Sequence, residues 1–391
     1  MSKRVGMEVS VALTEAVKLA QVDVIAAYPI TPQTHIPESL AEKVANGELD
    51  CEYICVESEH SAMSACLGSS AAGARTFTAS AGQGLELMHE VLYVASAMRL
   101  PVVMAVANRA LSAPLNVWGD HSDAMATRDV GWIQIFSENG QEAFDLTLCS
   151  FRIAEHPDVL IPVMMHLDGF HLSHMVEPIF LEDEELVNKF LPPYKYPYVL
   201  DPDKPVTLGA FTPPISYTEA KKAQEVALCQ SRTTIKKVWK EYGDLTGRYY
   251  NPVESYCADD AEILLLTMGS FSETATLAVD KLREEGKKVG LIRLRLWRPF
   301  PFEELRKAVK KAKVLVVFDR CISFGGPGGP VSSEVKSALY SSTPKPRVIS
   351  FVGGLGGRDV FPQDFENMLN QGFEALKKKP KEEFQMIGVR E

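Results

Sequence analysis

The sequence predicts an α/β protein, in which a doubly wound domain precedes a smaller α/β domain. In the first half, short and nearly continuous apolar runs alternate with helical patterns at least five times. Such runs are typical of parallel strands that are buried on both faces. A second alternation begins at Ala261, and 391 residues exceed what one hydrophobic core holds. We therefore expect a first domain over 1–175, an extended arm with a long helix over 176–258, and a second domain over 259–391.

Each element of the first half follows from hydrophobic spacing. Apolar residues recur at helical intervals in some segments and form short, partly β-branched runs in others. The expected strands are Val22–Ala27, Tyr53–Val56, Thr76–Ser80, Val102–Ala107, Trp132–Phe136 and Leu160–Met165. The expected helices are Glu8–Ala20, Ile36–Val44, a helix from Ser58 onward, Gln83–Arg99 and Gln141–Glu155.

The turns that follow these strands contain most of the unusual polar chemistry of the first half. In doubly wound sheets, ligands bind outside the carboxyl ends of the strands. We therefore expect five turns to line one crevice. They are Tyr28–Pro32, Glu57–Ala62, Ser80–Gly84, Ala107–Asp123 and His166–His174.

Two charged residues in these turns are candidates for a functional role. Glu59 lies where a strand becomes a helix, and Ser58 can cap that helix; the alternative is an ordinary acidic residue at a helix start. Arg109 opens the longest loop, where a guanidinium can bind a small carboxylate in a bidentate manner. An ordinary ion pair explains Arg109 equally well. Gly82 and Gly84 lack the third glycine of a dinucleotide fingerprint and favour a tight turn.

The second half begins with a proline- and acid-rich stretch, in which only Tyr217–Tyr242 has a helical stripe. After it, strands and helices alternate again. The expected strands are Glu262–Thr267, Val289–Leu296, Lys313–Asp319 and Arg347–Val352. The expected helices are Ser272–Glu285, Phe302–Ala312 and Val331–Tyr340.

Composition excludes several classes of function. The net charge of -10 and the lack of a basic stripe argue against nucleic-acid binding. No signal peptide or membrane span is visible, so we expect a cytoplasmic protein. The seven cysteines are scattered without any CxxC spacing, which argues against an iron–sulfur or zinc site on this chain. His166, His171 and His174 with Asp168 favour polar loop packing over a metal site.

Taken together, the turns resemble those of a known family. They resemble the α subunit of the multi-subunit pyruvate:ferredoxin oxidoreductases. The segments that carry the resemblance are YPITPQTHIPE, VESEHSAMSACLGSSAAGARTFTAS, GLELMHEVLY and MRLPVVMAVANRALSAPLNVWGDHSD, with the later RPFP, DRCISFG and GGLGGRD. The resemblance extends from about residue 5 to about residue 370. The combination of YPITP with ESEHSA about 25 residues later is specific to this family of 2-oxoacid:ferredoxin oxidoreductases.

The resemblance implies a pyrimidine-binding domain for thiamine diphosphate, followed by a domain like the C-terminal domain of transketolase. Enzymes of this kind hold magnesium and the diphosphate through a GDG motif. This chain has GDH at 119–121 and GDL at 243–245 but no GDG. A β subunit is therefore expected to supply the diphosphate and Mg²⁺ half of the site. The [4Fe-4S] clusters are expected on partner chains, with γ and ferredoxin-like δ subunits or their equivalents completing the complex.

The same resemblance implies roles for five residues. Glu59 matches the glutamate that shares a proton with N1′ of the cofactor's aminopyrimidine. Thr31 matches the residue that hydrogen-bonds the substrate, and Arg109 matches the residue that pairs with the substrate carboxylate. Ile30 and Gly82 match cofactor contacts.

The implied activity is reversible oxidative decarboxylation of a 2-oxoacid by an enzyme of anaerobic metabolism, with coenzyme A as acyl acceptor and ferredoxin as electron acceptor. Pyruvate is the expected substrate; branched-chain 2-oxoacids, 2-oxoglutarate and aryl glyoxylates are alternatives that the sequence does not separate. Two other interpretations are a thiamine enzyme that transfers its acyl group to lipoamide and a non-catalytic scaffold subunit. YPITP argues against the first of these, and the joint presence of Thr31, Glu59 and Arg109 argues against the second.

Overall fold

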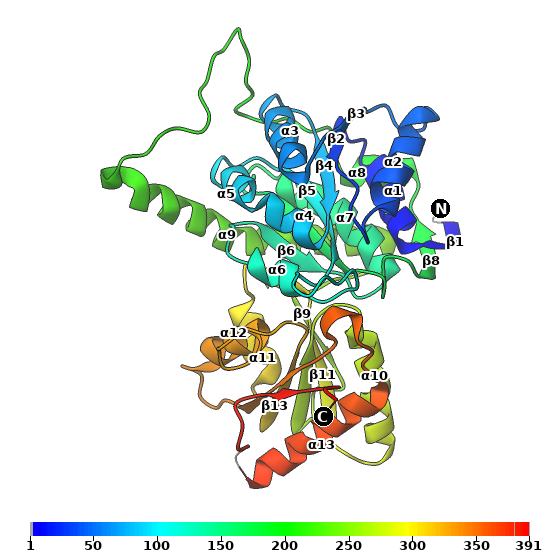
Figure 1. Ribbon diagram of the computed structural model, residues 1–391, viewed down its shortest axis with the longest axis vertical. Coiled ribbons are helices and arrows are strands. Elements are labelled where there is room, and N and C mark those ends of the chain that lie inside the picture. The colour runs from blue at the N-terminus through cyan, green and yellow to red at the C-terminus, as the bar shows by residue number, and fades with distance from the viewer. Residues whose placement is uncertain (1–2, 379, 391) are drawn as a thin grey trace.

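The computed structural model describes residues 3–378 and 380–390. These residues form two α/β units, one at each end of the long axis of the molecule (Figure 1). The first unit is built around a seven-stranded sheet with the order β12-β6-β7-β5-β4-β2-β3. The second contains a six-stranded sheet with the order β15-β14-β13-β10-β11-β9. This architecture confirms the predicted fold class.

The first unit also contains a small antiparallel pair, β1 (Lys3–Glu8) with β8 (Val176–Leu181). The strands of its main sheet are β2 (Val24–Ala27), β3 (Glu52–Cys55), β4 (Thr76–Ser80), β5 (Val103–Asn108), β6 (Ile133–Phe136), β7 (Val163–Asp168) and β12 (Leu296–Arg298). Its helices are α1 (Val9–Leu19), α2 (His35–Ala45), α3 (Glu59–Ala71), α4 (Gly82–Leu87), α5 (His89–Ala97), α6 (Ser122–Ala126), α7 (Gly140–Ala154), α8 (Glu184–Phe190) and α9 (Pro214–Thr246).

Strand β5 shows why this sheet is buried on both faces. Val103, Ala105 and Ala107 belong to the core that also contains residues of α1 and α7. Met104 and Val106, which point to the opposite face, pack with residues of α3 and α5. The strand therefore needs apolar side chains at every position, which is the continuous pattern that predicted a parallel sheet.

The second unit is smaller and is also mostly parallel, with β9 as its antiparallel edge strand. Its strands are β9 (Val253–Tyr256), β10 (Ile263–Thr267), β11 (Val289–Leu294), β13 (Val314–Asp319), β14 (Arg347–Val352) and β15 (Gln385–Met386). Its helices are α10 (Phe271–Glu284), α11 (Phe302–Val309), α12 (Pro330–Leu339), α13 (Pro362–Lys377) and the short 3-10 helix η1 (Leu355–Gly357).

Three sequence predictions are wrong in detail. The predicted helix Gln83–Arg99 is two helices, α4 and α5, that meet at Met88. The stretch after residue 176 is more ordered than expected, since it contains β8 and α8 as well as α9.

The third error concerns the predicted strand Val289–Leu296, which belongs to two sheets. Its end leaves β11 and enters β12, which pairs antiparallel with β6 in the first unit. Leu296 is buried in the first core, and the Arg295 guanidinium forms a buried ion pair with Glu142 of α7. Strand β12 lies within the predicted second domain (259–391) but pairs with the sheet of the first unit. The expected domain boundaries stay a prediction.

A buried ion pair joins the two units. Asp168, the last residue of β7, accepts hydrogen bonds from the Arg320 guanidinium and from the Ser270 backbone N–H (2.8 Å) and hydroxyl (2.6 Å). Its Oδ1 also lies 2.8 Å from His121 Nε2. Burial opposes the charge of Asp168, but Arg320 and His121 lower the pKa of this carboxyl below its usual value. Both Asp168 and Arg320 are at least 98% buried, so these partners must hold the carboxylate in its charged form.

Replacement of Arg320 by alanine should strongly destabilise the protein. The change leaves the Asp168 carboxylate buried beside fewer donors, which costs about 3–5 kcal/mol for a broken buried pair. Urea-induced unfolding of the two proteins measures this difference. Lys236→Ala is the matched control, because its exposed ion pair with Glu304 also joins the two units and such pairs contribute less than about 1 kcal/mol. Equal losses in both variants would contradict the central role of Arg320.

Candidate active site

The five predicted turns follow the carboxyl ends of β2, β3, β4, β5 and β7, and contacts link them side by side. Arg109 Nη1 donates to the Thr31 carbonyl at 3.0 Å, which ties the loop after β5 to the turn after β2. The Gly169 N–H donates to the Asn108 carbonyl at 3.1 Å and joins the turn after β7. Helix α4 lies between Arg109 and Glu59, since Gly82 contacts the first and Gly84 the second. The predicted crevice residues therefore gather at one edge of the sheet.

Glu59 is the first residue of α3, and its side chain is turned inward. Ser58 caps this helix, with its hydroxyl accepting from the Ser61 N–H at 3.2 Å. Glu59 itself is 5% exposed. Among the described residues, no side chain or backbone group forms a hydrogen bond or ion pair with its carboxylate. A buried carboxylate costs free energy unless it is paired, so this group is suited to a donor that comes from outside the chain.

Gly84 makes room for that carboxylate. A Cβ atom at position 84 would lie 2.8 Å from both Cγ and Cδ of Glu59, well inside van der Waals contact. Any side chain at this position would displace Glu59. The second glycine of the Gly82-Gln83-Gly84 turn is therefore explained by close approach of a carboxylate.

Arg109 is 7% exposed, and its side chain lies against Gly82 at the start of α4. Its Nε donates to the Asn116 carbonyl at 2.9 Å and its Nη1 to the Thr31 carbonyl at 3.0 Å. Neither bond is to a carboxylate side chain, so the guanidinium charge is oriented by neutral carbonyls. The alternative of an ordinary ion pair is not what the structure shows, because no ion pair of Arg109 occurs among the described residues.

Gly82 allows Arg109 to lie against α4. Its φ angle of +47° falls in the left-handed region, and a Cβ atom there would lie 3.0 Å from Arg109 Cδ. Both features favour glycine.

The Asp123 carboxylate connects the segments that carry Gly82 and Arg109. Its Oδ2 accepts from the backbone N–H groups of Gly82 and Arg109, each at 2.9 Å. Its Oδ1 accepts from Asn108 Nδ2 at 2.9 Å and from the Ala124 N–H at 2.7 Å. Burial raises the pKa of Asp123 to about 7, and the donors from Arg109, Asn108 and Gly82 oppose that rise. One carboxylate thus fixes the two segments that carry Gly82 and Arg109.

Thr31 and Ile30 lie in the turn after β2. Thr31 is exposed and Ile30 is half-buried. The backbone carbonyl of Thr31 is engaged by Arg109, whereas its hydroxyl makes no protein hydrogen bond within the described chain. Gln33 holds the turn in place by donating to the carbonyls of Tyr28 (3.0 Å) and Ala79 (3.2 Å).

The histidine cluster serves packing in this structure. His166 lies stacked 4.4 Å from the ring of Phe136, and burial lowers the pKa of His166 to about 3. Asp168 and His121 belong to the interface with the second unit. Within residues 3–378 and 380–390, no three His, Cys, Asp or Glu side chains are grouped so as to hold a metal ion. Over the same ranges, no helix has both the length and the apolar character of a membrane span.

Sequence reasoning missed how the second unit closes over the site. The Gly357 N–H donates to the Gly119 carbonyl at 2.8 Å, and Asn116 Nδ2 donates to the Gly356 carbonyl at 3.1 Å. The loop that carries Arg109 is therefore held between the two units. The glycine-rich sequence at 353–357 could have indicated this contact, because only small residues permit such a close approach. A Cβ atom at Gly357 would collide with Trp118.

Comparison with known proteins gives a consistent result. A family model described as pyruvate flavodoxin/ferredoxin oxidoreductase, thiamine diP-binding, matches residues 15–240. The pyruvate:ferredoxin oxidoreductase core domain II matches residues 261–365. Pyruvate synthase subunit PorA of Pyrococcus abyssi is 48% identical over 100% of this chain and 99% of its own length. Ketoisovalerate oxidoreductase subunit VorA of Pyrococcus horikoshii is 46% identical over 88% of this chain and 87% of its own.

Two solved structures share the fold. A 2-oxoglutarate:ferredoxin oxidoreductase from Magnetococcus marinus superimposes with a TM-score of 0.69 at 19% identity, covering 94% of this chain and 65% of that chain. A split-gene transketolase superimposes with a TM-score of 0.54 at 12% identity, over 95% of this chain and 99% of that one. At these identities the likeness concerns the architecture alone.

Gly84→Ala and Gly68→Ala should change stability in opposite directions. Alanine normally stabilises a helix by about 0.5–1 kcal/mol relative to glycine. Gly68 is exposed on α3, and a Cβ atom added there would have nothing within 4 Å, so Gly68→Ala should raise the free energy of unfolding. Gly84→Ala should lower it by about 1–3 kcal/mol through overpacking against Glu59. Urea titration tests both variants, and stabilisation by Gly84→Ala would show that Glu59 does not occupy this space.

Proposed function

The chain belongs to the pyruvate:ferredoxin oxidoreductase family, and on that basis we propose that it is the α subunit of a complex that converts pyruvate reversibly to acetyl-coenzyme A and carbon dioxide. Electrons from this oxidation pass to ferredoxin. The family contains thiamine diphosphate-binding oxidoreductases, and the matching domain covers residues 15–240. Full-length identity of 48% to a pyruvate synthase subunit supports pyruvate as the substrate.

The buried, unpaired carboxylate of Glu59 is the observation that carries this proposal. An aminopyrimidine offers at N1′ the proton-sharing partner that this carboxylate lacks within the described chain. Gly84 leaves the space that this side chain occupies, and Ser58 caps the helix turn that begins with Glu59. The site therefore fits the pyrimidine part of thiamine diphosphate. The thiazolium part of that cofactor would supply the carbon that adds to the 2-oxo group and the ring that takes up the electron pair left by decarboxylation.

Glu59 would hold the proton at N1′ and so set the protonation state of the ring. Arg109 would bind the substrate carboxylate, because its Nη2 group makes no hydrogen bond and its guanidinium forms no ion pair within the described chain. The hydroxyl of Thr31 makes no hydrogen bond within the described chain, lies in the turn that Arg109 contacts, and would donate to the substrate. Ile30 and Gly82 would form the wall against which the pyrimidine packs.

The rest of the catalytic machinery would come from partner chains. The chain has no GDG motif, so a β subunit would bind the diphosphate and Mg²⁺. All seven cysteines are free and dispersed, which supports placing the [4Fe-4S] clusters on partner chains such as γ and ferredoxin-like δ subunits. The free thiols also support a reducing, cytoplasmic location.

A branched-chain 2-oxoacid is the second candidate substrate. The observation that favours it is the 46% identity to a ketoisovalerate oxidoreductase subunit, close to the values for pyruvate synthase subunits. Pyruvate and 2-oxoisovalerate differ only in apolar carbons, for which discrimination is about 1–3 kcal/mol per methylene. Turnover of the purified complex with each acid as sole substrate decides between them; a preference for 2-oxoisovalerate would overturn the assignment of pyruvate.

Glu59→Gln should abolish most turnover while the complex still assembles. Glutamine keeps the size of the side chain but does not share a proton with N1′, and loss of such acid–base assistance costs roughly 100- to 10,000-fold in rate. Pyruvate-dependent ferredoxin reduction measures turnover, and gel filtration measures assembly. Glu57→Gln is the matched control, because Glu57 is exposed two residues away and its replacement should leave the rate unchanged. Full activity of Glu59→Gln would refute the role of Glu59, and a scaffold subunit would behave in that way.

Arg109→Ala should raise the half-saturating concentration of the 2-oxoacid. Loss of a charge-assisted hydrogen bond costs about 1.5–3 kcal/mol, which corresponds to roughly a 10- to 150-fold change. Steady-state kinetics with pyruvate and with ferredoxin as the varied substrate separate the two binding events. Arg128→Ala, which removes an ion pair with the neighbouring Asp129, serves as control. A change confined to ferredoxin would contradict the proposed contact with the substrate.

A further inference from the structure

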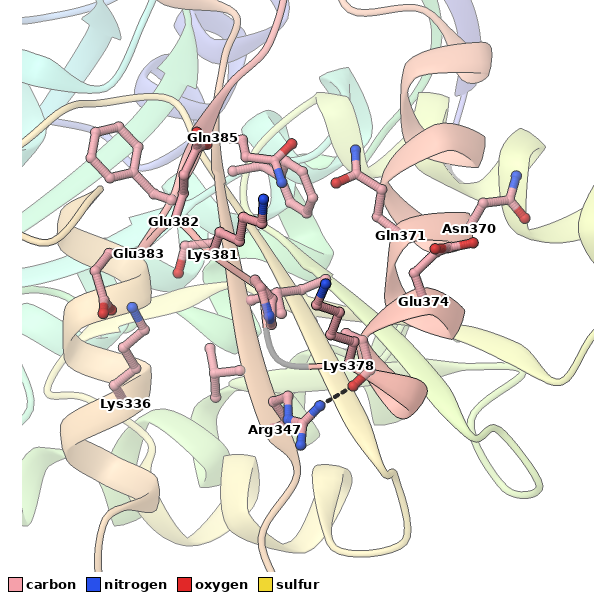
Figure 2. Close-up of a pocket in the computed structure, with 17 residues that line it drawn as sticks. Lys336, Arg347, Asn370, Gln371, Glu374, Lys378, Lys381, Glu382, Glu383 and Gln385 are labelled. Carbon is pink, nitrogen blue, oxygen red and sulfur yellow. Dashed lines mark hydrogen bonds between the residues drawn. The ribbon is translucent and has the colours of Figure 1, made fainter.

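The second unit contains a cavity that the proposed reaction does not use. It has a volume of about 890 Å3 and lies at the outer edge of β14, between α12 and α13. Figure 2 shows its lining, with the segment before β15 passing over the strand edge. Cavities that bind small molecules typically measure about 300–1,000 Å3. The size is therefore that of a ligand site rather than a packing defect.

The floor of the cavity is a strand edge with unused hydrogen-bonding capacity. Strand β15 pairs with β14 only at Phe351 and Val352. The Arg347 N–H donates toward β13, to the Lys313 carbonyl, whereas the Val352 carbonyl accepts from Ile387 on the outer side. Peptide groups alternate between the two sides of a strand, so those of Val348 and Ser350 face outward. Val348 lies beyond the reach of β15 and opens onto the cavity.

Ser350 adds a buried polar group without a partner. Its side chain lines the cavity and is 3% exposed, and its Oγ has no hydrogen-bond partner among the described residues. Buried hydroxyl groups are nearly always hydrogen-bonded in proteins. An unpaired hydroxyl beside an open strand edge indicates that a polar ligand completes this surface.

The lining is rich in cations. Lys336, Lys378 and Lys381 make no ion pair with any residue of the described chain, and Arg347 donates to the Ala375 carbonyl at the end of α13. Figure 2 shows the amino groups of Lys378 and Lys381 extending over the strand. Three carboxylates, Glu374, Glu382 and Glu383, also line the cavity, so the four cations exceed the acids by one. This small excess of positive charge favours an anionic ligand that also has neutral polar groups.

From these observations we propose that the cavity is a binding site for a phosphorylated metabolite of nucleotide size. Its phosphates bind Lys378 and Lys381, and its planar polar part bonds to Ser350 Oγ and to the peptide groups of Val348. Ile349 and Phe384, which also line the cavity, provide apolar contacts for a ring.

An added peptide strand is the competing occupant of this edge. The register of β15 places Phe384, Glu383 and Glu382 opposite Ser350, Ile349 and Val348 if the pairing continued. The pairing stops at Phe351, but the tail residues Lys381–Phe384 still line the cavity beside this edge, so an added peptide strand would have to displace them. A small molecule can occupy the existing volume of about 890 Å3 without that displacement, so the structure favours it.

Isothermal titration calorimetry of the full chain with ATP tests the proposal, and tripolyphosphate and adenosine are the reference ligands. We expect saturable ATP binding that is stronger than binding of either reference compound. Lys378→Ala/Lys381→Ala should weaken ATP binding by about tenfold or more, since charge-assisted bonds are lost. Ser350→Ala should weaken ATP binding without changing the affinity for tripolyphosphate. Lys310→Ala/Lys311→Ala, at the end of α11 and outside the cavity lining, is the matched control.

Three results would overturn the proposal. The first is no saturable binding of ATP. The second is equal weakening by the cavity and control double variants, which would indicate non-specific attraction to surface charge. The third is binding of an extended acidic hexapeptide but not of ATP, which would assign the edge to strand addition. Melting temperatures of all variants confirm that each one folds.

Discussion

The contact between Asp168 and Arg320 is the constraint on which the arrangement of the molecule depends. It fixes the end of β7 against the second unit, and Arg320 also donates to the Gly119 carbonyl at 2.9 Å. The loop that follows β5 is thereby held at its far end. Asp123, four residues after Gly119, then positions the backbone of Gly82 and Arg109. A buried charge at the interface thus determines the geometry of residues that lie on the crevice.

The candidate site contains groups that a chain selected for stability alone would not retain. Glu59 places a carboxylate in a buried position without a donor among the described residues, and Arg109 directs a guanidinium at carbonyls rather than at an acid. Each arrangement costs free energy in the isolated chain, because buried charge is costly unless it is paired. In the proposed function, a cofactor ring and a substrate carboxylate would supply the missing partners and reduce both costs. Unsatisfied groups at one sheet edge are therefore the physical sign of the site.

The two units divide the work in the proposed complex. The first would provide one half of a cofactor site, and the second closes over the Arg109 loop through residues 356 and 357. On its outer side the second unit leaves the edge of β14 open beside lysines that form no ion pair within the described residues. The second unit thus contacts the loop that carries Arg109 on one side and contains the cavity on another.

The sequence by itself determined the strand and helix periods, the doubly wound order and the gathering of five turns at one edge, because hydrophobic spacing is local and parallel strands share their carboxyl ends. It also placed Glu59 at the start of a helix capped by Ser58, which the structure confirms. Only the tertiary structure decided that Arg109 bonds to carbonyls, that Asp123 is the common acceptor, and that Leu296–Arg298 joins the first sheet. These contacts join residues that are up to about 160 positions apart, and they depend on how whole units pack, which no local pattern records.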